Sequence, residues 1–444
     1  MKDDPPETRH PSRAHLHPAI LTGALFLALR VPLLVARAPF FDELFTRWIA
    51  GKSFVAILAA LRLDSGPPLY YFVVHMLGDP SIEAIRVLSL LFAATSLSLI
   101  LRSNRVAAAG SAALLMAVFP PSVLFAADAR AYAMCAMFVT IAVLAIDEDR
   151  PFVAAIALVL AAYAHYYGVL FFPILLVTAA GPAAIQPAGR RRYAWPRHDA
   201  WLRRFAALAL AVVLFIPGLL LALRQPAEAR AWMTTEWPDG LFVRPPVALA
   251  IAGAIAVLAS LRINRYLFMV IVPLILAVAL RVYVPMRFEV VVAAPLVLWL
   301  AESLRQNRFR LALMTALAGA GIAWSALGIV DHANRPVDSY RQAGLWVSGN
   351  IAANQNVVAS GYCYLVTLMD GHPLNGLPRV TAFPPEQADH PGWRALPRPG
   401  LRSPAGLFFW IGERNAPELD VFVRDRRRIQ PLFINDRAMV ALVR

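Results

Sequence analysis

The chain has 444 residues, of which 59% are hydrophobic and only 16% are charged. Soluble domains have about 45–50% apolar and about 25% charged residues, so this composition excludes an ordinary soluble enzyme and a disordered chain. The net charge of +14 does not indicate nucleic-acid binding, because the basic residues fall in short clusters between apolar blocks. The two cysteines, Cys135 and Cys363, give neither a disulfide framework nor a metal-spaced pair. We therefore expect an α-helical polytopic membrane protein.

Apolar blocks long enough to cross a bilayer recur along the first three quarters of the chain, and each crossing needs about 20 residues. We predict about eleven transmembrane helices from these blocks. They cover residues 19–36, 82–101, 106–125, 131–146, 151–166, 167–181, 205–223, 246–261, 266–280, 290–304 and 311–330. The pair between 151 and 181 is separated only by Tyr166, Tyr167 and Gly168.

The distribution of Lys and Arg predicts the orientation in the membrane. If residues 1–18 form a cytoplasmic tail, more basic residues fall in the inner loops than in the outer ones, as the positive-inside rule requires. Residues 19–330 then form the transmembrane domain, with residues 37–81 as its first outer loop, and residues 331–444 lie outside. A cleaved signal peptide is the alternative for the first block, but Arg30 and Pro32 interrupt its apolar core.

After residue 331 the apolar runs shorten to strand length, and polar residues, Pro and Gly become more frequent. This change predicts a small α/β domain that faces water. We expect helices over 338–349 and 418–428, and strands over 356–361, 407–411 and 439–443.

The first outer loop carries the most informative acidic residues. Apolar side chains recur at helical spacing from Phe41 to Ile49, which predicts an amphipathic helix along the membrane surface. Asp42 lies at the start of this helix, where its alternative role is an N-cap. Asp64 precedes a turn that two prolines make rigid, and this turn can hold it at a set distance from Asp42.

Three later segments place charged or aromatic residues at outer helix junctions. Asp128, Arg130 and Tyr132 alternate in the first, where a plain interfacial ion pair with an aromatic anchor is the alternative. His165 lies among tyrosines in the second, where a structural histidine is the alternative. Arg287 lies in the third, where the phosphate of a lipid would be within its reach.

In this order, the segments resemble the membrane glycosyltransferases of the GT-C class. The similarity is to family 39 and the aminoarabinose transferases, bacterial relatives of the protein O-mannosyltransferases. The strings that carry it are Asp42-Glu43, Gly66 to Tyr71, Asp128 to Tyr132, Ala164 to Tyr166 and Arg287-Phe288, and it covers residues 20–305. Gly66 stands where relatives often have His or a charged residue, and Asp128 where they have Glu, which puts a metal role of that histidine in doubt.

The resemblance implies an inverting transfer of a sugar from a polyprenyl-phosphate donor to a hydroxyl acceptor at the outer face of the bacterial inner membrane. The acceptor is a lipid, a polysaccharide or a protein, and no nucleic acid takes part. Asp42 is the expected general base. Its neighbour Glu43, with Asp128, would hold sugar hydroxyls or a divalent cation, although no cofactor is certain.

The remaining candidates bind substrate in this interpretation. Arginines would receive the phosphate of the leaving lipid. The substrate-binding candidates are Asp64, Asp128, Arg130, Tyr132, His165, Arg86 and Arg287, and Arg30 is a further candidate that could instead snorkel to the interface.

Two other functions are alternatives to a glycosyltransferase. A flippase or transporter for the same lipids should show paired halves and polar groups at mid-membrane, and the sequence shows neither. The other alternative is a scaffold that only anchors the C-terminal domain, and it would give the acidic residues of the first loop no function. The enzyme interpretation requires Asp42 and Asp128 to face one shared pocket.

Overall fold

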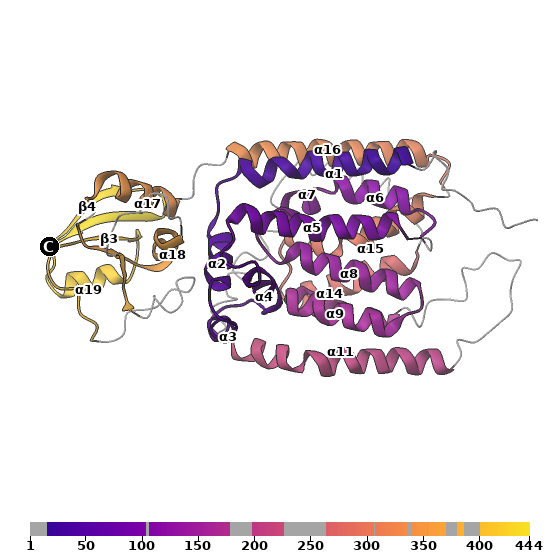
Figure 1. The fold of residues 1–444 in the computed structure, drawn as a ribbon, viewed down its shortest axis with the longest axis horizontal. Helices are drawn as coiled ribbons and strands as arrows, with labels where there is room; N and C mark the ends of the chain where they lie inside the picture. Colours follow the sequence, from indigo (N-terminus) through magenta and orange to yellow (C-terminus); the bar gives the residue numbers. More distant parts are fainter. Residues whose placement is uncertain are drawn as a thin grey trace, which may run out of the picture.

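A computed structural model gives the fold of the chain (Figure 1). The structure describes residues 16–103, 106–177, 198–225, 263–305, 307–334, 339–352, 354–369, 380–385 and 400–444. Most of these residues belong to a bundle of apolar helices, and the last part of the chain forms a sheet domain beyond one end of the bundle.

Two long helices lie side by side at one edge of the bundle, α1 (Leu16–Ala36) and α16 (Arg310–Asn334). The long helix α11 (His198–Arg224) lies at the opposite edge. Between these edges are α5 (Ile82–Leu101), α6 (Ala109–Val118), α7 (Pro120–Ala126), α8 (Tyr132–Asp147), α9 (Pro151–Ala164), α14 (Arg265–Ala279) and α15 (Arg287–Leu304). Their buried side chains form one continuous apolar core.

Helices long and apolar enough to cross a membrane number four within the described residues, or five if the bent pair α6 and α7 is one span. The predicted count of eleven is therefore not confirmed. The predicted block 167–181 is not one α-helix, because a 3₁₀ helix, η2 (Tyr166–Phe171), precedes the short α10 (Ile174–Val177). The block 246–261 lies outside the described residues. Large exposed apolar side chains, such as Val213 and Leu220 on α11, suit contact with lipid.

Three short helices cover the end of the bundle that faces the sheet domain: α2 (Phe41–Ala50), α3 (Phe54–Leu61) and α4 (Leu69–His75). The amphipathic helix predicted from the first loop is α2, and its side chains Leu44, Phe45 and Ile49 are buried. Ser53 begins α3 by accepting a hydrogen bond from the N–H of Ala56. These helices and their connections carry Asp42, Glu43 and Asp64 at this end of the bundle.

The sheet domain contains five strands in the order β2-β1-β3-β5-β4. The strands are β1 (Val357–Ala359), β2 (Val380–Ala382), β3 (Phe408–Glu413), β4 (Ile429–Ile434) and β5 (Ala438–Val443). β1 runs parallel to β2 and β3, whereas β5 runs antiparallel to β3 and β4. The helices α17 (Ser339–Asn350) and α18 (Gly361–Met369) pack on one face, and α19 (Glu418–Arg424) packs on the other. The expected small α/β domain is present.

The largest difference from the predicted boundaries in this domain is at its last helix. The helix predicted over 418–428 ends at Arg424, and β4 follows it closely. Arg426 has a φ of 57°, a left-handed conformation that an α-helix does not accommodate. The domain contacts the bundle through Tyr362 of α18, whose ring packs edge-on against Phe41 of α2 at 4.4 Å.

Candidate active site

Glu43 is the centre of a buried ion-pair network behind α2. Its carboxylate accepts hydrogen bonds from Arg86 at 2.9 and 2.5 Å and from Arg37 at 3.0 Å. It also accepts the backbone N–H of Ala129 at 3.0 Å, and that of Phe40 at 3.4 Å at the start of α2. The Glu43 carboxylate is fully buried, and four donor groups surround it, so it has little capacity left for a substrate.

Arg86 and Arg37 extend this network to the neighbouring segments. Arg86 donates to the main-chain carbonyls of Leu34 and Arg37, both at 2.9 Å. Arg37 donates to the Asp128 carboxylate at 2.8 Å, and Asp128 is 3% exposed. The network therefore ties together the end of α1, the start of α2, the α5 helix and the turn before α8. Breaking one member of such a buried pair typically costs about 3–5 kcal/mol of stability.

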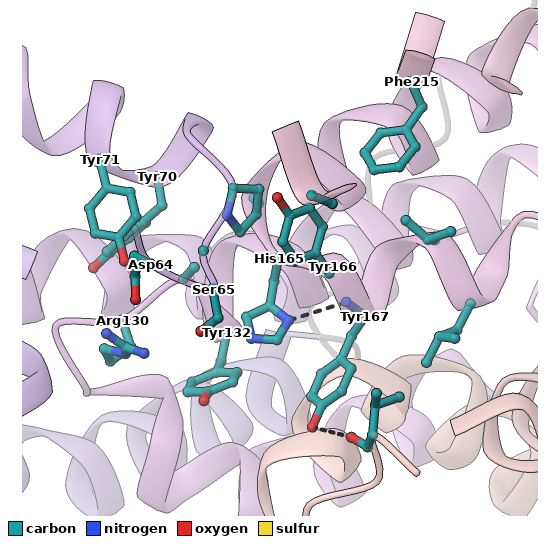
Figure 2. A pocket seen from close by; sticks show the side chains of 18 of the residues that line it. Asp64, Ser65, Tyr70, Tyr71, Arg130, Tyr132, His165, Tyr166, Tyr167 and Phe215 are labelled. Atoms are coloured by element: carbon teal, nitrogen blue, oxygen red, sulfur yellow. Dashed lines mark hydrogen bonds between the residues drawn. The ribbon is translucent and has the colours of Figure 1, made fainter. Parts of the chain in front are cut away.

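A cavity of about 380 Å³ lies beside this network, at the same end of the bundle (Figure 2). One end of the cavity is polar, with Asp64, Ser65, Arg130, Tyr132 and His165 in its wall. The apolar part of the lining consists of Val169, Leu170, Phe215, Leu219, Leu280 and Val282. Figure 2 shows Asp64 and Arg130 at one side and Phe215 of α11 at the far side. This amphipathic shape suits a ligand with a charged head and a hydrocarbon tail.

The turn between α3 and α4 holds Asp64 at the cavity wall. Gln225, at the end of α11, donates to the carbonyls of Leu61 and Gly66, on either side of Asp64. A Cβ added at Gly66 would lie 3.1 Å from the Tyr71 hydroxyl and 3.2 Å from the Asp64 carboxylate. A larger residue at position 66 would therefore have to displace Asp64 or Tyr71. Burial raises the pKa of Asp64, and the nearby Arg130 and the backbone of the turn oppose this effect.

Arg130 lies near two of the candidate acids of the first outer loop, Asp42 and Asp64. Its Nη1 donates to the main-chain carbonyl of Asp42 at 3.3 Å, and its Nη2 is 3.8 Å from the Asp42 carboxylate. Asp64 is close enough to interact electrostatically with both Arg130 and Asp42. The pairing with Asp42 is loose, so the Arg130 guanidinium keeps donor capacity toward the cavity.

His165 and Tyr132 form the floor of the polar end. Nδ1 of His165 accepts the backbone N–H of Tyr167 at 3.2 Å, so a neutral His165 carries its proton on Nε2. Burial lowers the pKa of His165, and Arg130 and Arg287 lower it further. Phe288, which follows Arg287 at the start of α15, packs edge-on against Tyr167 of the cavity wall at 5.5 Å, so Arg287 lies near the cavity. The Tyr132 ring packs against His165 at 5.0 Å. The site therefore combines cations with neutral hydrogen-bonding groups.

The carboxylates are not arranged to hold a metal ion. The described residues contain no group of three or more His, Cys, Asp or Glu side chains that could bind one. Arginines surround Glu43 and Asp128, and Arg130 lies beside both Asp42 and Asp64. A divalent cation would have to displace these guanidinium groups, so this donor set does not fit one.

The structure thus separates the candidate residues into two groups. Asp64, Arg130, Tyr132 and His165 line the cavity, with Asp42 and Arg287 close to it. Glu43, Arg86 and Asp128 belong to the buried network. The expectation that Asp42 and Asp128 face one shared pocket is wrong: Asp128 turns toward Arg37, and the described acidic residue in the cavity wall is Asp64. An enzyme interpretation therefore has to rest on Asp64 and Arg130 instead of on that pair of aspartates.

The sequence did not identify four residues that contribute to this region: Arg37, Gln225, Phe215 and Leu219. Arg37 belongs to none of the motifs, although only five residues separate it from Glu43. Gln225 gives no sequence signal, because its partners are main-chain carbonyls far away in the chain. Phe215 and Leu219 of the apolar wall lie within the predicted transmembrane helix over 205–223, where apolar residues are expected in any case. Arg30 lies at the bend between α6 and α7, away from the cavity.

Comparison with solved structures identifies the fold. The chain is similar to ArnT from Cupriavidus metallidurans in the apo state, with a TM-score of 0.53 and 12% identity over 97% of this chain and 98% of that one. The same protein bound to undecaprenyl phosphate gives a TM-score of 0.51 at 12% identity, covering 96% and 97%. The resemblance to the GT-C class inferred from the sequence is therefore confirmed at the level of the fold.

A weaker similarity is to the oligosaccharyltransferase of Archaeoglobus fulgidus in complex with Zn and sulfate. It has a TM-score of 0.46 and 15% identity over 82% of this chain and 62% of that one. No protein-family model matches the sequence. The comparison with curated proteins also gives no match.

Proposed function

We propose that this protein is a membrane glycosyltransferase that takes a sugar from a polyprenyl-phosphate donor and transfers it, with inversion, to a hydroxyl acceptor. The observation that carries the proposal is the cavity with Arg130 and Asp64 at one end and an apolar wall at the other. The fold supports it, because ArnT with undecaprenyl phosphate has the same fold. The site faces the outer side of a bacterial inner membrane, with the N-terminus in the cytoplasm.

In an inverting transfer, the acceptor oxygen attacks the anomeric carbon from the side opposite to the departing phosphate, so the reaction needs a base at the acceptor hydroxyl and a cation at the phosphate. The acceptor hydroxyl gives its proton to a carboxylate while its oxygen bonds to the anomeric carbon. The bond between that carbon and the phosphate oxygen breaks, and the polyprenyl phosphate leaves as an anion. Arg130 stabilises the phosphate, with Arg287 as the second cation.

Asp64 and Asp42 are the two carboxylates beside Arg130. Asp42 is the base expected from the sequence. The geometry favours Asp64, because it lies in the cavity wall and burial raises its pKa, which makes it a stronger base. Asp42 would then orient Arg130. Tyr132 and His165 would hold sugar hydroxyls, while Glu43 and Asp128 support the site through the network.

The test is transfer of radiolabelled sugar from polyprenyl-phosphate donors to envelope acceptors by the purified protein. The expected result is transfer by the wild type, and its loss in Asp64→Asn with little change in donor affinity. If Asp42→Asn instead shows the larger loss at unchanged donor affinity, Asp42 is the base. If the wild type moves intact donor between leaflets and transfers no sugar, the protein is a flippase and the proposal fails.

A further inference from the structure

The helices α6 and α7 are two halves of one apolar segment, bent by 59° at Phe119. Pro120 and Pro121 follow the bend and have no N–H group. In a continuous α-helix, the N–H groups of residues 120 and 121 would pair with the carbonyls of Met116 and Ala117. The prolines therefore leave these two carbonyls without a donor inside an apolar bundle, which is strongly unfavourable.

Arg30 of α1 donates to both of these carbonyls. Its Nη1 is 2.7 Å from the Ala117 oxygen, and its Nη2 is 3.3 Å from the Met116 oxygen. Nη2 also lies 3.3 Å from the Ser122 hydroxyl on the far side of the bend. The Arg30 side chain is fully buried, and the structure gives it no carboxylate partner in the part of the chain that it describes. One guanidinium group thus bridges both halves of the segment.

A second helix completes the arrangement at the next residue. The carbonyl of Val118 accepts a hydrogen bond from the Ser325 hydroxyl of α16 at 3.2 Å. A Cβ added at Gly321 of α16 would lie 2.8 Å from the same carbonyl oxygen, so only glycine allows this approach. The three consecutive carbonyls before the bend therefore all receive side-chain donors, from α1 and from α16.

We propose that Arg30 is a positioning residue that supplies the two hydrogen-bond donors that Pro120 and Pro121 remove, and so fixes the bend between α6 and α7. The segment from Asp128 to Arg130 follows directly after α7, which ends at Ala126. Fixing the bend therefore fixes where Arg130 enters the cavity. The positioning of Arg130 rests on the proposed function, whereas the pairing of the carbonyls does not.

A pair of neutral variants separates this role from phosphate binding. Arg30→Gln keeps a side-chain N–H donor without the charge, whereas Arg30→Met keeps neither. If Arg30 acts by donating hydrogen bonds to the carbonyls, the melting temperature of Arg30→Met falls by about 5 °C or more, and that of Arg30→Gln falls clearly less. Equal melting temperatures for the two variants would overturn the proposal. Both variants lack the positive charge, and only Arg30→Gln keeps a donor for the carbonyls, so equal values would mean that the donor does not matter.

Restoring a backbone donor gives an independent check. Pro121→Ala returns the N–H that pairs with the Ala117 carbonyl in a continuous helix, so it should recover part of the stability or folded yield that Arg30→Met loses. It should have little benefit beside an intact Arg30. If neither Arg30 variant folds and Pro121→Ala rescues neither, Arg30 does not act through these carbonyls.

Binding of polyprenyl phosphate, measured at a temperature where all variants are folded, tests the effect on Arg130. The dissociation constant should rise about tenfold in Arg30→Met and much less in Arg30→Gln. Equal affinities in the two variants would show that the bend does not position Arg130. If the wild type itself binds no polyprenyl phosphate, the proposed function fails, and the melting temperatures still decide the role of Arg30.

Discussion

The buried network around Glu43 and the polar end of the cavity lie next to each other, yet they use the same kinds of side chain differently. In the network, guanidinium groups and backbone N–H groups surround the carboxylate of Glu43 at hydrogen-bond distance. At the cavity, Arg130 pairs only loosely with Asp42, and Asp64 faces open space. Fully paired charges hold a structure together, whereas partly paired charges beside a cavity can act on a ligand.

The largest effect should come from the network. Glu43→Gln leaves the buried Arg86 without a counter-charge and leaves Arg37 with Asp128 alone, so we expect a loss of about 3–5 kcal/mol in the free energy of unfolding or a failure to fold. Thermal melting in detergent measures it. Asp79→Asn is the matched control, because the Asp79 side chain is 83% exposed and pairs with Arg47 at the surface, where little stability is lost. A Glu43→Gln protein that melts like the wild type and has lost only transfer would place Glu43 in the chemistry.

Asp64→Asn should separate chemistry from stability. We expect the transfer rate to fall by about 10²–10⁴, the usual contribution of a general base. The folded-state pKa of Asp64 is raised, so this carboxyl group stabilises the fold only at low pH and loses that contribution as pH rises through the folded-state pKa. A neutral Asn should therefore leave the melting temperature at neutral pH unchanged or slightly higher. A clear drop in melting temperature with unchanged transfer would make Asp64 structural.

Arg130→Gln should weaken the donor side of the reaction. Hydrogen bonds to charged groups are worth about 1.5–3 kcal/mol, which corresponds to about a 10- to 150-fold rise in the donor KM. Initial rates at varied donor and acceptor concentrations measure this change. An effect confined to the acceptor KM would remove Arg130 from the phosphate site.

The pH dependence of transfer should report the same carboxylate. Burial raises the pKa of Asp64 above its usual value near 3.8, and the protonated form cannot act as a base. Activity should therefore fall as the pH drops through this raised pKa, with the acidic limb above pH 3.8. The residual activity of Asp64→Asn should lack this limb. A limb that persists in Asp64→Asn and disappears in Asp42→Asn would assign it to Asp42.

Gly66→Ala should have the smallest effect. The added Cβ would lie within 3.2 Å of both the Tyr71 hydroxyl and the Asp64 carboxylate, and both side chains can yield by a few tenths of an ångström. We expect a loss of transfer of about tenfold or less, since small displacements of a catalytic group have measurable cost. Gly51→Ala is a suitable control, because its new Cβ would meet only backbone atoms at 3.6 Å. Equal activity of the two variants would show that the turn around Asp64 tolerates displacement.

The sequence predicts those features that depend on local pattern. Helical periodicity predicted α2, and runs of strand length predicted β1, β3 and β5. Motif order predicted the GT-C fold, which the similarity to ArnT confirms. Local pattern also failed where a short segment changes direction, as at η2 after α9, because two apolar blocks in succession do not reveal a 3₁₀ helix.

The division of the charged residues could not be predicted, because it depends on contacts between distant segments. Nothing near Glu43 in the chain shows that Arg86 binds it from α5. Likewise, Asp64 and Asp128 are both aspartates near outer helix ends. Only the packed structure shows which of them faces the cavity. The sequence alone leaves Arg30 as a candidate phosphate ligand, because it does not show that Arg30 donates to the carbonyls of Met116 and Ala117.

The central claim is that the cavity beside Arg130 binds a lipid-linked phosphate, and direct binding of polyprenyl phosphate to the purified protein tests it most directly. We predict saturable binding to the wild type, weaker binding to Arg130→Gln, and loss of binding when Leu219→Trp places a larger side chain in the apolar lining of the cavity. Binding that neither substitution changes would contradict the account, and so would a wild-type protein that binds no polyprenyl phosphate.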